Sequence, residues 1–563
     1  MTNPIQSVKS ELRSIIIDAY KRAVSQNELP ETEIGDFVVE IPNEAGFGDF
    51  ASNFAMQYAK TLKIAPRKIA ETLVKYFNFT GSLIEKCEIA GPGFINFFVN
   101  NKWLSDIINI IYAENEDYGK TKRDKKEKIM VEFVSANPTG PMHMGNARGG
   151  ALGDCLAEIL TWSGNDVSRE FYVNDAGNQI EKFYDSLNAR YHQIFLGEDG
   201  YPFPEDGYFG DDIKELANDF YKIHGNKYFN SAEYERKNAL ITFALDKNIA
   251  QIKSDLIKYR IDFDVWFYES SLHKDGEVSE TVQLLKDSGH TYEKDGALWF
   301  NATEMGAEKD EVLIRSNGFY TYFAVDMAYH RNKFNRGFDK VIDILGADHH
   351  GHVVRFKEGI NAVGVDSSKL DIILMQLVNL IEDGKPVKMS KRTGKAISLS
   401  DLLEDISVDA ARFFFNLRAY DSHFDFDLDL AKEQTNQNPV YYVQYAFARI
   451  SSILRVLSEE GITVKDAKEL DLSLLTAPEE TLLIKALARF PEEIVEAAKN
   501  YDPSRITRYI IDISSLFHKF YNECRVKDEE KNLMDARLML CWCVRTVIKN
   551  ALALLKVTAP ERM

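Results

Sequence analysis

Three nearly continuous apolar stretches limit the folds that are open to this chain. They are IMVEFVSAN (129–137), KVIDILGA (340–347) and KLDIILMQLV (369–378), and helix-like segments lie between them. A strand without polar alternation is typically buried on both faces, and strands that alternate with helices favour a parallel sheet. The sequence therefore predicts an α/β domain with a Rossmann-like, doubly wound parallel sheet that helices cover on both faces.

The segments before and after this domain show other patterns. Residues 5–25 place apolar side chains on one helical face, a second helix is expected within 50–77, and GPGFINFFV (91–99) is expected to form a strand. These elements predict a small N-terminal α/β domain. The charged run KTKRDKKEK (120–128) follows as a linker, because nothing in it can be buried. The C-terminal part has helical periodicity and predicts an all-α bundle of four or five helices.

We accordingly divide the chain into domains at residues 1–118, 119–437 and 438–563. A length of 563 residues agrees with three or four domains of about 150 residues each. Residues 181–290 are polar, rich in tyrosine and mostly helical, so we expect them to be an insertion in the sheet domain.

Charge is distributed unevenly over these domains. The net charge of −19 argues at first against a polyanionic partner. Residues 1–110 hold 11 Lys and Arg against 13 Asp and Glu, and residues 440–563 hold 18 of each, which leaves a net −17 in the middle. The two ends therefore permit RNA binding, although their charge does not demonstrate it.

Cysteine content and hydropathy indicate where the protein acts. The five cysteines are too few and too scattered for a disulfide framework, so buried thiols in a reducing compartment are expected. No stretch approaches the ~18 uninterrupted apolar residues of a membrane helix. The start, MTNPIQSVKSELRS, lacks the apolar core of a secretion signal. We therefore expect a cytoplasmic protein without a membrane partner.

The stretch PTGPMHMGNARGGALGD (138–154) follows the first apolar strand and opens a helix. A helix N-terminus presents unpaired N–H groups that bind phosphate, and Gly145 would let a ligand approach the backbone. His143 and Asn146 can donate hydrogen bonds to such a ligand. A tight turn with a surface histidine explains the H-x-G-N tetrapeptide equally simply and is favoured for it alone. Neither G-x-x-x-x-G-K-[ST] nor G-x-G-x-x-G occurs in the chain.

A second stretch, GKPVKMSKRTGKAIS (384–398), concentrates five basic side chains, four of them between two glycines and the fifth directly after the second glycine. Such a loop can close on a phosphate chain and neutralise charge as it develops. A solvated basic loop is the simpler alternative. The two stretches together, however, resemble the paired signatures of class I aminoacyl-tRNA synthetases. That resemblance implies ATP binding by both loops, attack of an amino-acid carboxylate on the α-phosphate, and transfer to the 2′-hydroxyl of the terminal adenosine of tRNA.

Longer stretches narrow the resemblance to bacterial arginyl-tRNA synthetases. They include VEFVSANPTGPMHMGNARGGALGD, FYVNDAGNQI, TYFAVDMAYHRNKF, GADHHGH, DAARFFF, DFDLDLA, NPVYYVQYAFARI and the terminal APERM. PNEAGFGDFASNFAM and AGPGFINFFV are similar to the N-terminal tRNA-binding domain of that family, and the bundle is similar to its anticodon-binding domain. The resemblance covers essentially the whole chain. One departure is Asn146, where the family usually has a second histidine, so we expect retained activity with altered ATP contacts.

The resemblance also implies roles for individual residues. Catalytic roles fall to His143, Asn146, Lys388 and Lys391. ATP binding falls to Pro138, His143, Gly145, Asn146, Gly346, Asp348, His352, Met389 and Ser390, arginine binding to Glu132, Asn137, Tyr322 and Asp326, and tRNA binding to Met563.

Glu132 and Asp326 also fit the substrate on physical grounds. Both are acidic residues in apolar runs, and a planar guanidinium requires bidentate carboxylates. A helix-capping role for Asp326 and a surface-facing role for Glu132 are the alternatives, and the two interpretations are even without the resemblance. Lysine as substrate would leave part of the acceptor array unpaired, which disfavours it.

GADHHGH (346–352) could instead suggest a metal site. Adjacent histidine rings converge poorly on one ion, and the run stands at a position that resembles the ribose contact of the family. The resemblance therefore implies nucleotide binding there, no metal held by the protein, and Mg²⁺ that arrives with ATP. The expected partners are ATP, L-arginine and tRNA(Arg), without DNA, and the expected state is a monomer that needs tRNA before it activates arginine. A synthetase for another amino acid and a non-catalytic tRNA-binding paralogue remain as alternatives.

Overall fold

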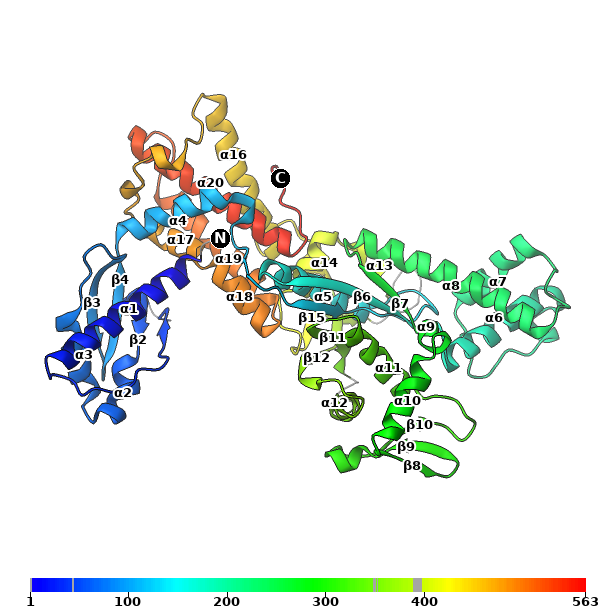
Figure 1. Ribbon diagram of the computed structural model, residues 1–563. Helices are drawn as coiled ribbons and strands as arrows, with labels where there is room; N and C mark the ends of the chain where they lie inside the picture. Colours follow the sequence, from blue (N-terminus) through cyan, green and yellow to red (C-terminus); the bar gives the residue numbers. More distant parts are fainter. Residues whose placement is uncertain (1–2, 43–44, 348–350, 352, 388–396) are drawn as a thin grey trace.

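The computed structural model describes residues 3–42, 45–347, 351, 353–387 and 397–563. Its N-terminal part is a four-stranded antiparallel sheet with helices packed on it, and it stands apart at the left of Figure 1. The strand order is β1-β2-β4-β3, with bounds Val39–Glu40, Phe50–Ser52, Phe94–Val99 and Ile84–Ala90. The helices are α1 (Pro4–Ser25), α2 (Phe54–Leu62) and α3 (Pro66–Tyr76).

Local signals set the ends of these helices. The Asn3 side chain accepts from Ile5 N and Gln6 N, and Pro4 occupies the first helical position, so α1 begins there. The single helix expected within 50–77 is two helices, because Lys63 takes a left-handed conformation with φ 56° and ends α2. Helix α4 (Asn101–Glu114) then leads away from this sheet and lies along the C-terminal bundle (Figure 1).

The central sheet is parallel and five-stranded, in the order β12-β11-β5-β6-β7. Its strands are β5 (Lys128–Glu132), β6 (Asp166–Val173), β7 (Val265–Tyr268), β11 (Lys340–Gly346) and β12 (Leu370–Met375). The prediction of a doubly wound parallel sheet is thereby confirmed.

Helices cover both faces of this sheet. Ile129 and Val131 pack with α5 (Met144–Trp162), whereas Met130 packs with α11 (Tyr322–Asn335) and α12 (Val353–Ala362). The chain runs from β5 outward to β6 and β7, and then returns to β11 on the other side of β5. Such a reversal leaves a crevice at the carboxyl ends of β5 and β11, which is where open α/β sheets bind ligands.

The segment expected to be one insertion is not wholly outside the sheet. Helices α6 (Asn178–Leu196), α7 (Asp211–His224) and α8 (Glu233–Lys258) form a lobe at the right of Figure 1. The chain then re-enters the sheet as β7, which pairs with β6, and leaves again through α9 (Glu269–Lys274) and α10 (Glu277–Asp287). A short apolar run such as VWFY is too brief for periodicity to separate strand from helix.

A three-stranded antiparallel sheet follows α10 and was not anticipated from the sequence. Its strands are β8 (Thr291–Lys294), β9 (Ala297–Phe300) and β10 (Glu311–Ile314). After β12 come β13 (Val378–Glu382), β14 (Lys385–Val387) and β15 (Phe424–Asp427), which form a second small sheet, and the short helices α13 (Leu399–Asp405), α14 (Val408–Phe415) and α15 (Leu428–Lys432).

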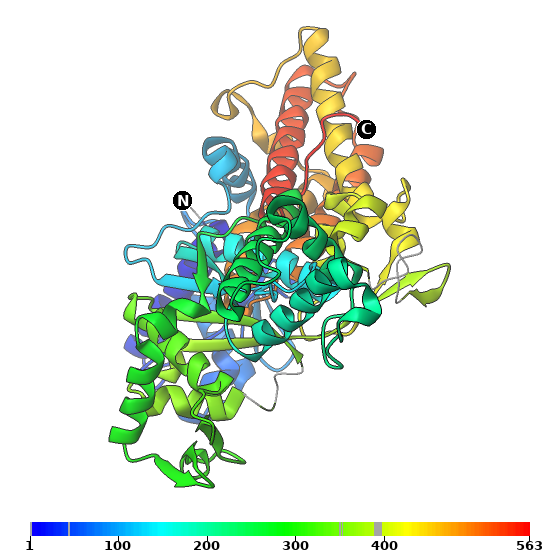
Figure 2. The same cartoon turned by 90° about the vertical axis from the view of Figure 1, so that its right-hand side faces the viewer.

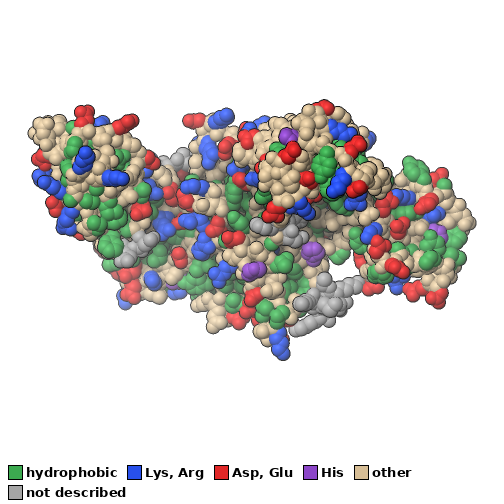
Figure 3. Space-filling view, turned by 90° about the horizontal axis from the view of Figure 1, so that it is seen from below, with side chains coloured by type: hydrophobic (Ala, Val, Ile, Leu, Met, Phe, Trp, Pro, Cys, Tyr) green, Lys and Arg blue, Asp and Glu red, His purple; other side chains and the backbone are tan. Residues whose placement is uncertain are grey.

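The C-terminal part is helical. Its helices are α16 (Pro439–Glu459), α17 (Pro478–Ala488), α18 (Phe490–Asn500), α19 (Ser504–Glu523) and α20 (Lys531–Leu554), and Figure 2 shows long helices stacked side by side above the sheet domain. On the face seen in Figure 3, basic and acidic side chains are interspersed rather than separated. Within the described residues, every helix is too short or too polar to cross a membrane.

Helix α5 approaches the sheet most closely at Gly153. A Cβ at this position would lie 2.3 Å from Cγ of Phe133, whose ring is fully buried. We therefore expect Gly153→Ala to destabilise the sheet domain by about 1–3 kcal/mol, the usual cost of overpacking a core. Thermal unfolding measures this change. Gly197→Ser serves as a control for substitution itself, because a Cβ there meets nothing within 4 Å, although its φ of 80° adds some backbone strain. Equal stability of Gly153→Ala and the unmodified protein would contradict the close packing.

Candidate active site

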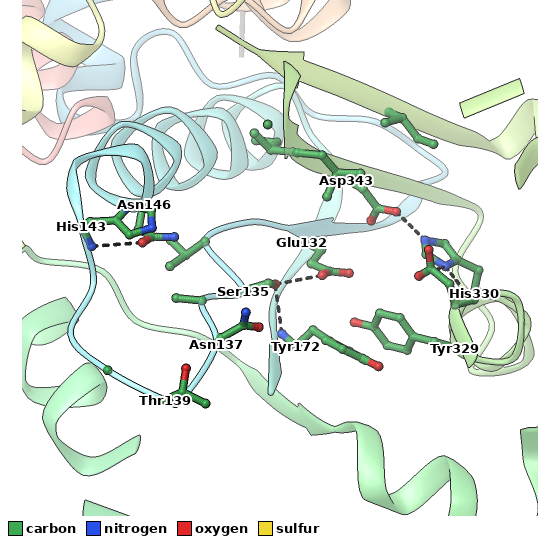
Figure 4. Close-up of a pocket in the computed structure, with 18 of the residues that line it drawn as sticks. Glu132, Ser135, Asn137, Thr139, His143, Asn146, Tyr172, Tyr329, His330 and Asp343 are labelled. Atoms are coloured by element: carbon green, nitrogen blue, oxygen red, sulfur yellow. Dashed lines mark hydrogen bonds and ion pairs between the residues drawn. The ribbon is translucent and has the colours of Figure 1, made fainter. Parts of the chain in front are cut away.

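A cavity of about 790 Å³ opens at the carboxyl ends of β5 and β11 (Figure 4). Its position agrees with the crevice that the strand order defines. Polar side chains from β5, the loop after it, α5, β6, α11 and β11 converge on it. Those labelled in Figure 4 are Glu132, Ser135, Asn137, Thr139, His143, Asn146, Tyr172, Tyr329, His330 and Asp343.

The His143 corner lies on one side of the cavity, where α5 begins. The Asn146 side-chain oxygen accepts a hydrogen bond from the His143 backbone N–H at 3.1 Å, which closes the first turn. The amide nitrogen of Asn146 is therefore the part of this side chain that can donate to a ligand. A Cβ on Gly145 would make only ordinary contacts with the His143 ring, so packing within the protein does not require glycine there.

The end of the basic loop meets this corner. Leu399 N donates to Met142 O at 2.9 Å, and His143 forms an isolated antiparallel bridge with Ser398. The two sequence stretches, although far apart in the chain, are thus joined at their described ends. Arg148 anchors α5 to the chain after β12. Its buried guanidinium donates to the carbonyl of Gln376 at 2.6 Å and to two carbonyls of the loop before β15.

Glu132 lies at the end of β5, in the floor of the cavity. Its Oε1 accepts from Ser135 Oγ at 2.8 Å, and its Oε2 lies 2.5 Å from the ammonium of Lys333. The chain after β5 turns through positive φ at Val134 (67°) and Ser135 (37°). A β-branched residue rarely adopts this conformation, and such local strain is common where a turn must present a side chain to a site.

Three further carboxylates lie around the floor and rim. Asp343 of β11 and Asp326 of α11 both line the cavity, and Glu269 lies behind Tyr172, whose hydroxyl donates to it at 2.8 Å. Burial raises the pKa of Glu269 to about 7. Glu269 is therefore not a full anion at neutral pH, but Glu132, Asp326 and Asp343 line the cavity and suit a cationic ligand.

The structure places the predicted site residues in three groups. Six line the cavity, namely Glu132, Asn137, His143, Asn146, Asp326 and Gly346. Pro138 and Gly145 lie beside it in the chain. Tyr322 is 52% exposed and lines another cavity, of about 720 Å³, and Met563 is exposed at the end of the chain. The rest lie outside the described residues, namely Asp348, His352, Lys388, Met389, Ser390 and Lys391.

Sequence reasoning did not identify the cations Lys333 and His330 or the second carboxylate of the cavity floor, Asp343. Asp343 stands within the apolar run KVIDILGA, just as Glu132 stands in its own run, so the same argument could have found it. Lys333 is seven residues after Asp326, a spacing that places both on one face of a helix. Nothing in the sequence signals that this lysine is buried, because lysines are rarely buried.

Comparison with known proteins agrees with this geometry. Three family models match: Arginyl tRNA synthetase N terminal domain at residues 8–99, tRNA synthetases class I (R), catalytic domain at 107–417, and DALR anticodon binding domain at 443–563. An arginine–tRNA ligase of Acetivibrio thermocellus is 54% identical, with all of both chains covered.

Solved structures give the same result. A putative arginyl-tRNA synthetase from Campylobacter jejuni has a TM-score of 0.76 and 34% identity, and the match covers 83% of this chain and 100% of that one. The arginyl-tRNA synthetase of Thermus thermophilus, 21% identical with a TM-score of 0.74 over 97% and 99% of the chains, shares the fold.

The parallel sheet, the His143 corner and the catalytic-domain match together define a class I aminoacyl-tRNA synthetase. Within that class, the chain belongs to the arginyl-tRNA synthetase family. It is an enzyme that uses ATP to join arginine to tRNA by way of an adenylate.

Proposed function

We propose that the cavity at the ends of β5 and β11 binds arginine and ATP together. The observation that carries this proposal is that one cavity is lined both by the carboxylates of Glu132 and Asp326 and by the His143 corner. The guanidinium lies against the two carboxylates and Asn137 holds the α-amino and carboxylate end. Tyr322, which lines the other cavity of about 720 Å³, is the fourth residue that we assign to arginine.

ATP lies against the His143 corner and the carboxyl end of β11. His143, Gly145, Asn146 and Pro138 contact its phosphates and ring, and Gly346 with Asp348 and His352 contacts its ribose. Lys388 and Lys391, with Met389 and Ser390 beside them, neutralise the departing pyrophosphate. Mg²⁺ accompanies ATP. These groups supply position and charge rather than a nucleophile, because the carboxylate of arginine itself attacks the α-phosphate.

The remaining parts serve tRNA(Arg). Residues 1–118 and 438–563 contact the tRNA, with the anticodon on the helical part near Met563, and residues 119–437 perform the chemistry. We place the protein in the cytoplasm and expect it to be a monomer. Sedimentation of the purified protein tests the monomeric state.

ATP–pyrophosphate exchange tests the activity: it should occur with arginine and with no other amino acid, and only when tRNA is added. Exchange with another amino acid would overturn the assignment of the pocket.

Glu132→Gln and Asp326→Asn test the arginine site. Each removes a charge but keeps the shape, and loss of a charged hydrogen-bond acceptor costs about 2–5 kcal/mol of binding. We therefore expect the KM for arginine to rise about 30-fold or more while the KM for ATP stays within about twofold. Exchange kinetics at varied arginine and ATP measure both. An unchanged KM for arginine in both folded variants would remove the carboxylates from the substrate site.

A further inference from the structure

Lys333 is a fully buried lysine directly beneath the proposed arginine site. Its ammonium lies 2.5 Å from Glu132 Oε2 and 2.8 Å from Asp343 Oδ1, and its side chain is 0% exposed. It also lies 4.3 Å from the centre of the Tyr329 ring. A buried ammonium is costly unless it is paired, and here it is paired twice.

The need for this cation follows from the sheet. Parallel pairing of β5 with β11 sets Glu132 directly beside Asp343. Two buried carboxylates at neighbouring positions repel each other, and one of them would normally take up a proton. Lys333 reaches from α11 to both, so it offsets this repulsion and links the helix to the two strands.

The other oxygen of each carboxylate is also held. Ser135 Oγ donates to Glu132 Oε1 at 2.8 Å, and His330 Nε2 lies 2.5 Å from Asp343 Oδ2. The second ring nitrogen of His330 lies 2.8 Å from the carbonyl oxygen of Asp326. Both ring nitrogens thus face acceptors, which favours the protonated imidazolium, although the ammonium of Lys333 also lies 3.4 Å from Nε2. Burial and Lys333 oppose this protonation, but Asp343 outweighs them, and the pKa of His330 is raised.

The cluster brings acidic and basic side chains together. Glu132, Asp343 and Asp326 line the cavity, and each lies beside Lys333 or His330. Without Lys333, one of the neighbouring carboxylates of Glu132 and Asp343 would take up a proton and bind a guanidinium less well.

We propose that Lys333 is a positioning residue for arginine: it fixes the Glu132 carboxylate and supplies the charge that lets Glu132 stand as an anion beside Asp343. The proposal rests on the proposed arginine site, because it assigns Lys333 a role through Glu132. A purely structural ion pair between α11 and the sheet is the alternative, and it predicts lower stability without a change in arginine affinity.

Lys333→Met is the first test. We expect the KM for arginine in tRNA-dependent exchange to rise roughly 10-fold or more at neutral pH, with a smaller effect on kcat and none on the KM for ATP. Lys333→Gln, which keeps a hydrogen-bond donor but no charge, should behave in the same way and replaces Lys333→Met if that variant does not fold. Thermal unfolding establishes folding in each case.

Arg336→Met provides a matched control on the same helix. Arg336 forms a bidentate pair with the buried Glu170 at 2.6 and 2.9 Å, on the strand next to β5, and does not line the cavity. Its loss removes an ion pair between α11 and the sheet, whereas its interaction with Glu132 is only a longer-range one between charges. The KM for arginine should therefore change far less than in the Lys333 variants, even where stability falls.

The pH dependence of the KM for arginine distinguishes a positioning role of Lys333 from a purely structural one. Burial raises the pKa of Glu132, and Lys333 is the largest influence that opposes this rise. Removing Lys333 raises that pKa further, so a larger share of Glu132 is protonated at a given pH, and it ionises again as the pH increases. The KM of the variant should thus fall towards that of the unmodified protein at alkaline pH. The charged and titratable groups around Glu132 are Lys333, His330, Tyr329, Asp326 and Arg336 of α11 and its end, Asp343 of β11, and Glu170 and Tyr172 of β6.

The outcomes are distinguishable. A higher KM for Lys333→Met that decreases as the pH rises, with a much smaller change in the KM of Arg336→Met, supports the proposal. An unchanged KM in folded Lys333 variants, while Glu132→Gln raises it, overturns the role of Lys333 and leaves the arginine site intact. If Glu132→Gln also has no effect, the proposed arginine site itself is wrong.

Discussion

Replacing His143 by alanine will lower the kcat of ATP–pyrophosphate exchange by about 10²–10³-fold, the usual effect of removing one donor that stabilises a developing negative charge. The KM for arginine should change little, because His143 lies on the opposite side of the cavity from the floor carboxylates (Figure 4). Steady-state exchange with tRNA present measures both constants. Stability should be preserved, since the His143 side chain is exposed.

Two further variants interpret this result. His290→Ala removes a histidine from the connection between α10 and β8 and should leave exchange unchanged. Asn146→Ala should also lower kcat, and by more than the loss of a ligand contact alone, because the Asn146 oxygen holds the first turn of α5 through the His143 N–H. If folded His143→Ala retained full exchange, the corner would be a turn and not a phosphate site.

Replacing Asp154 by asparagine will destabilise the sheet domain by about 3–5 kcal/mol, because it leaves buried cations without their shared anion. The fully buried Asp154 carboxylate contacts Arg412 at 2.6 Å, Lys556 at 2.8 Å and Arg169 at 3.1 Å. These residues come from α14, the chain after α20, and β6, so one carboxylate joins the helical bundle to the sheet. Thermal unfolding and limited proteolysis near Lys556 measure the loss.

The pH dependence of this contribution has a definite sign. Burial opposes ionisation of Asp154, but Arg412 and Lys556 outweigh it and lower its pKa. A carboxyl group with a lowered pKa stabilises the folded state at neutral pH and loses that contribution only as the pH falls through its folded value in acid. Glu88→Gln, which removes an exposed pair with Lys86, should not change the unfolding temperature. Equal stability of Asp154→Asn and the unmodified protein would contradict the role of the cluster.

The strands of the central sheet were predictable because burial on both faces leaves a direct trace in the sequence. KVIDILGA forms β11 almost to the residue, whereas β12 takes up only Leu370–Met375 of KLDIILMQLV, whose last residue begins β13. The two stretches that we assign to ATP were also recognisable in the sequence, because glycine, histidine and clustered basic residues have a characteristic spacing. Glu132 and Asp326 stood out as acids in apolar runs.

Other features depend on contacts between distant segments and left no such trace. β7 is a strand because it completes the edge of the sheet beside β6, although four apolar residues alone favour neither helix nor strand. The partnership of Lys333 with Glu132 and Asp343 arises from the register of β5 against β11 and from the placement of α11 over both strands.

The sequence by itself determined the class of fold, the family and the residues that carry conspicuous chemistry, because local pattern and residue type suffice for these. Only the tertiary structure decided which charges meet. A lysine in a sequence is expected in solvent, and it is the juxtaposition of two carboxylates on neighbouring strands that makes the buried position of Lys333 favourable.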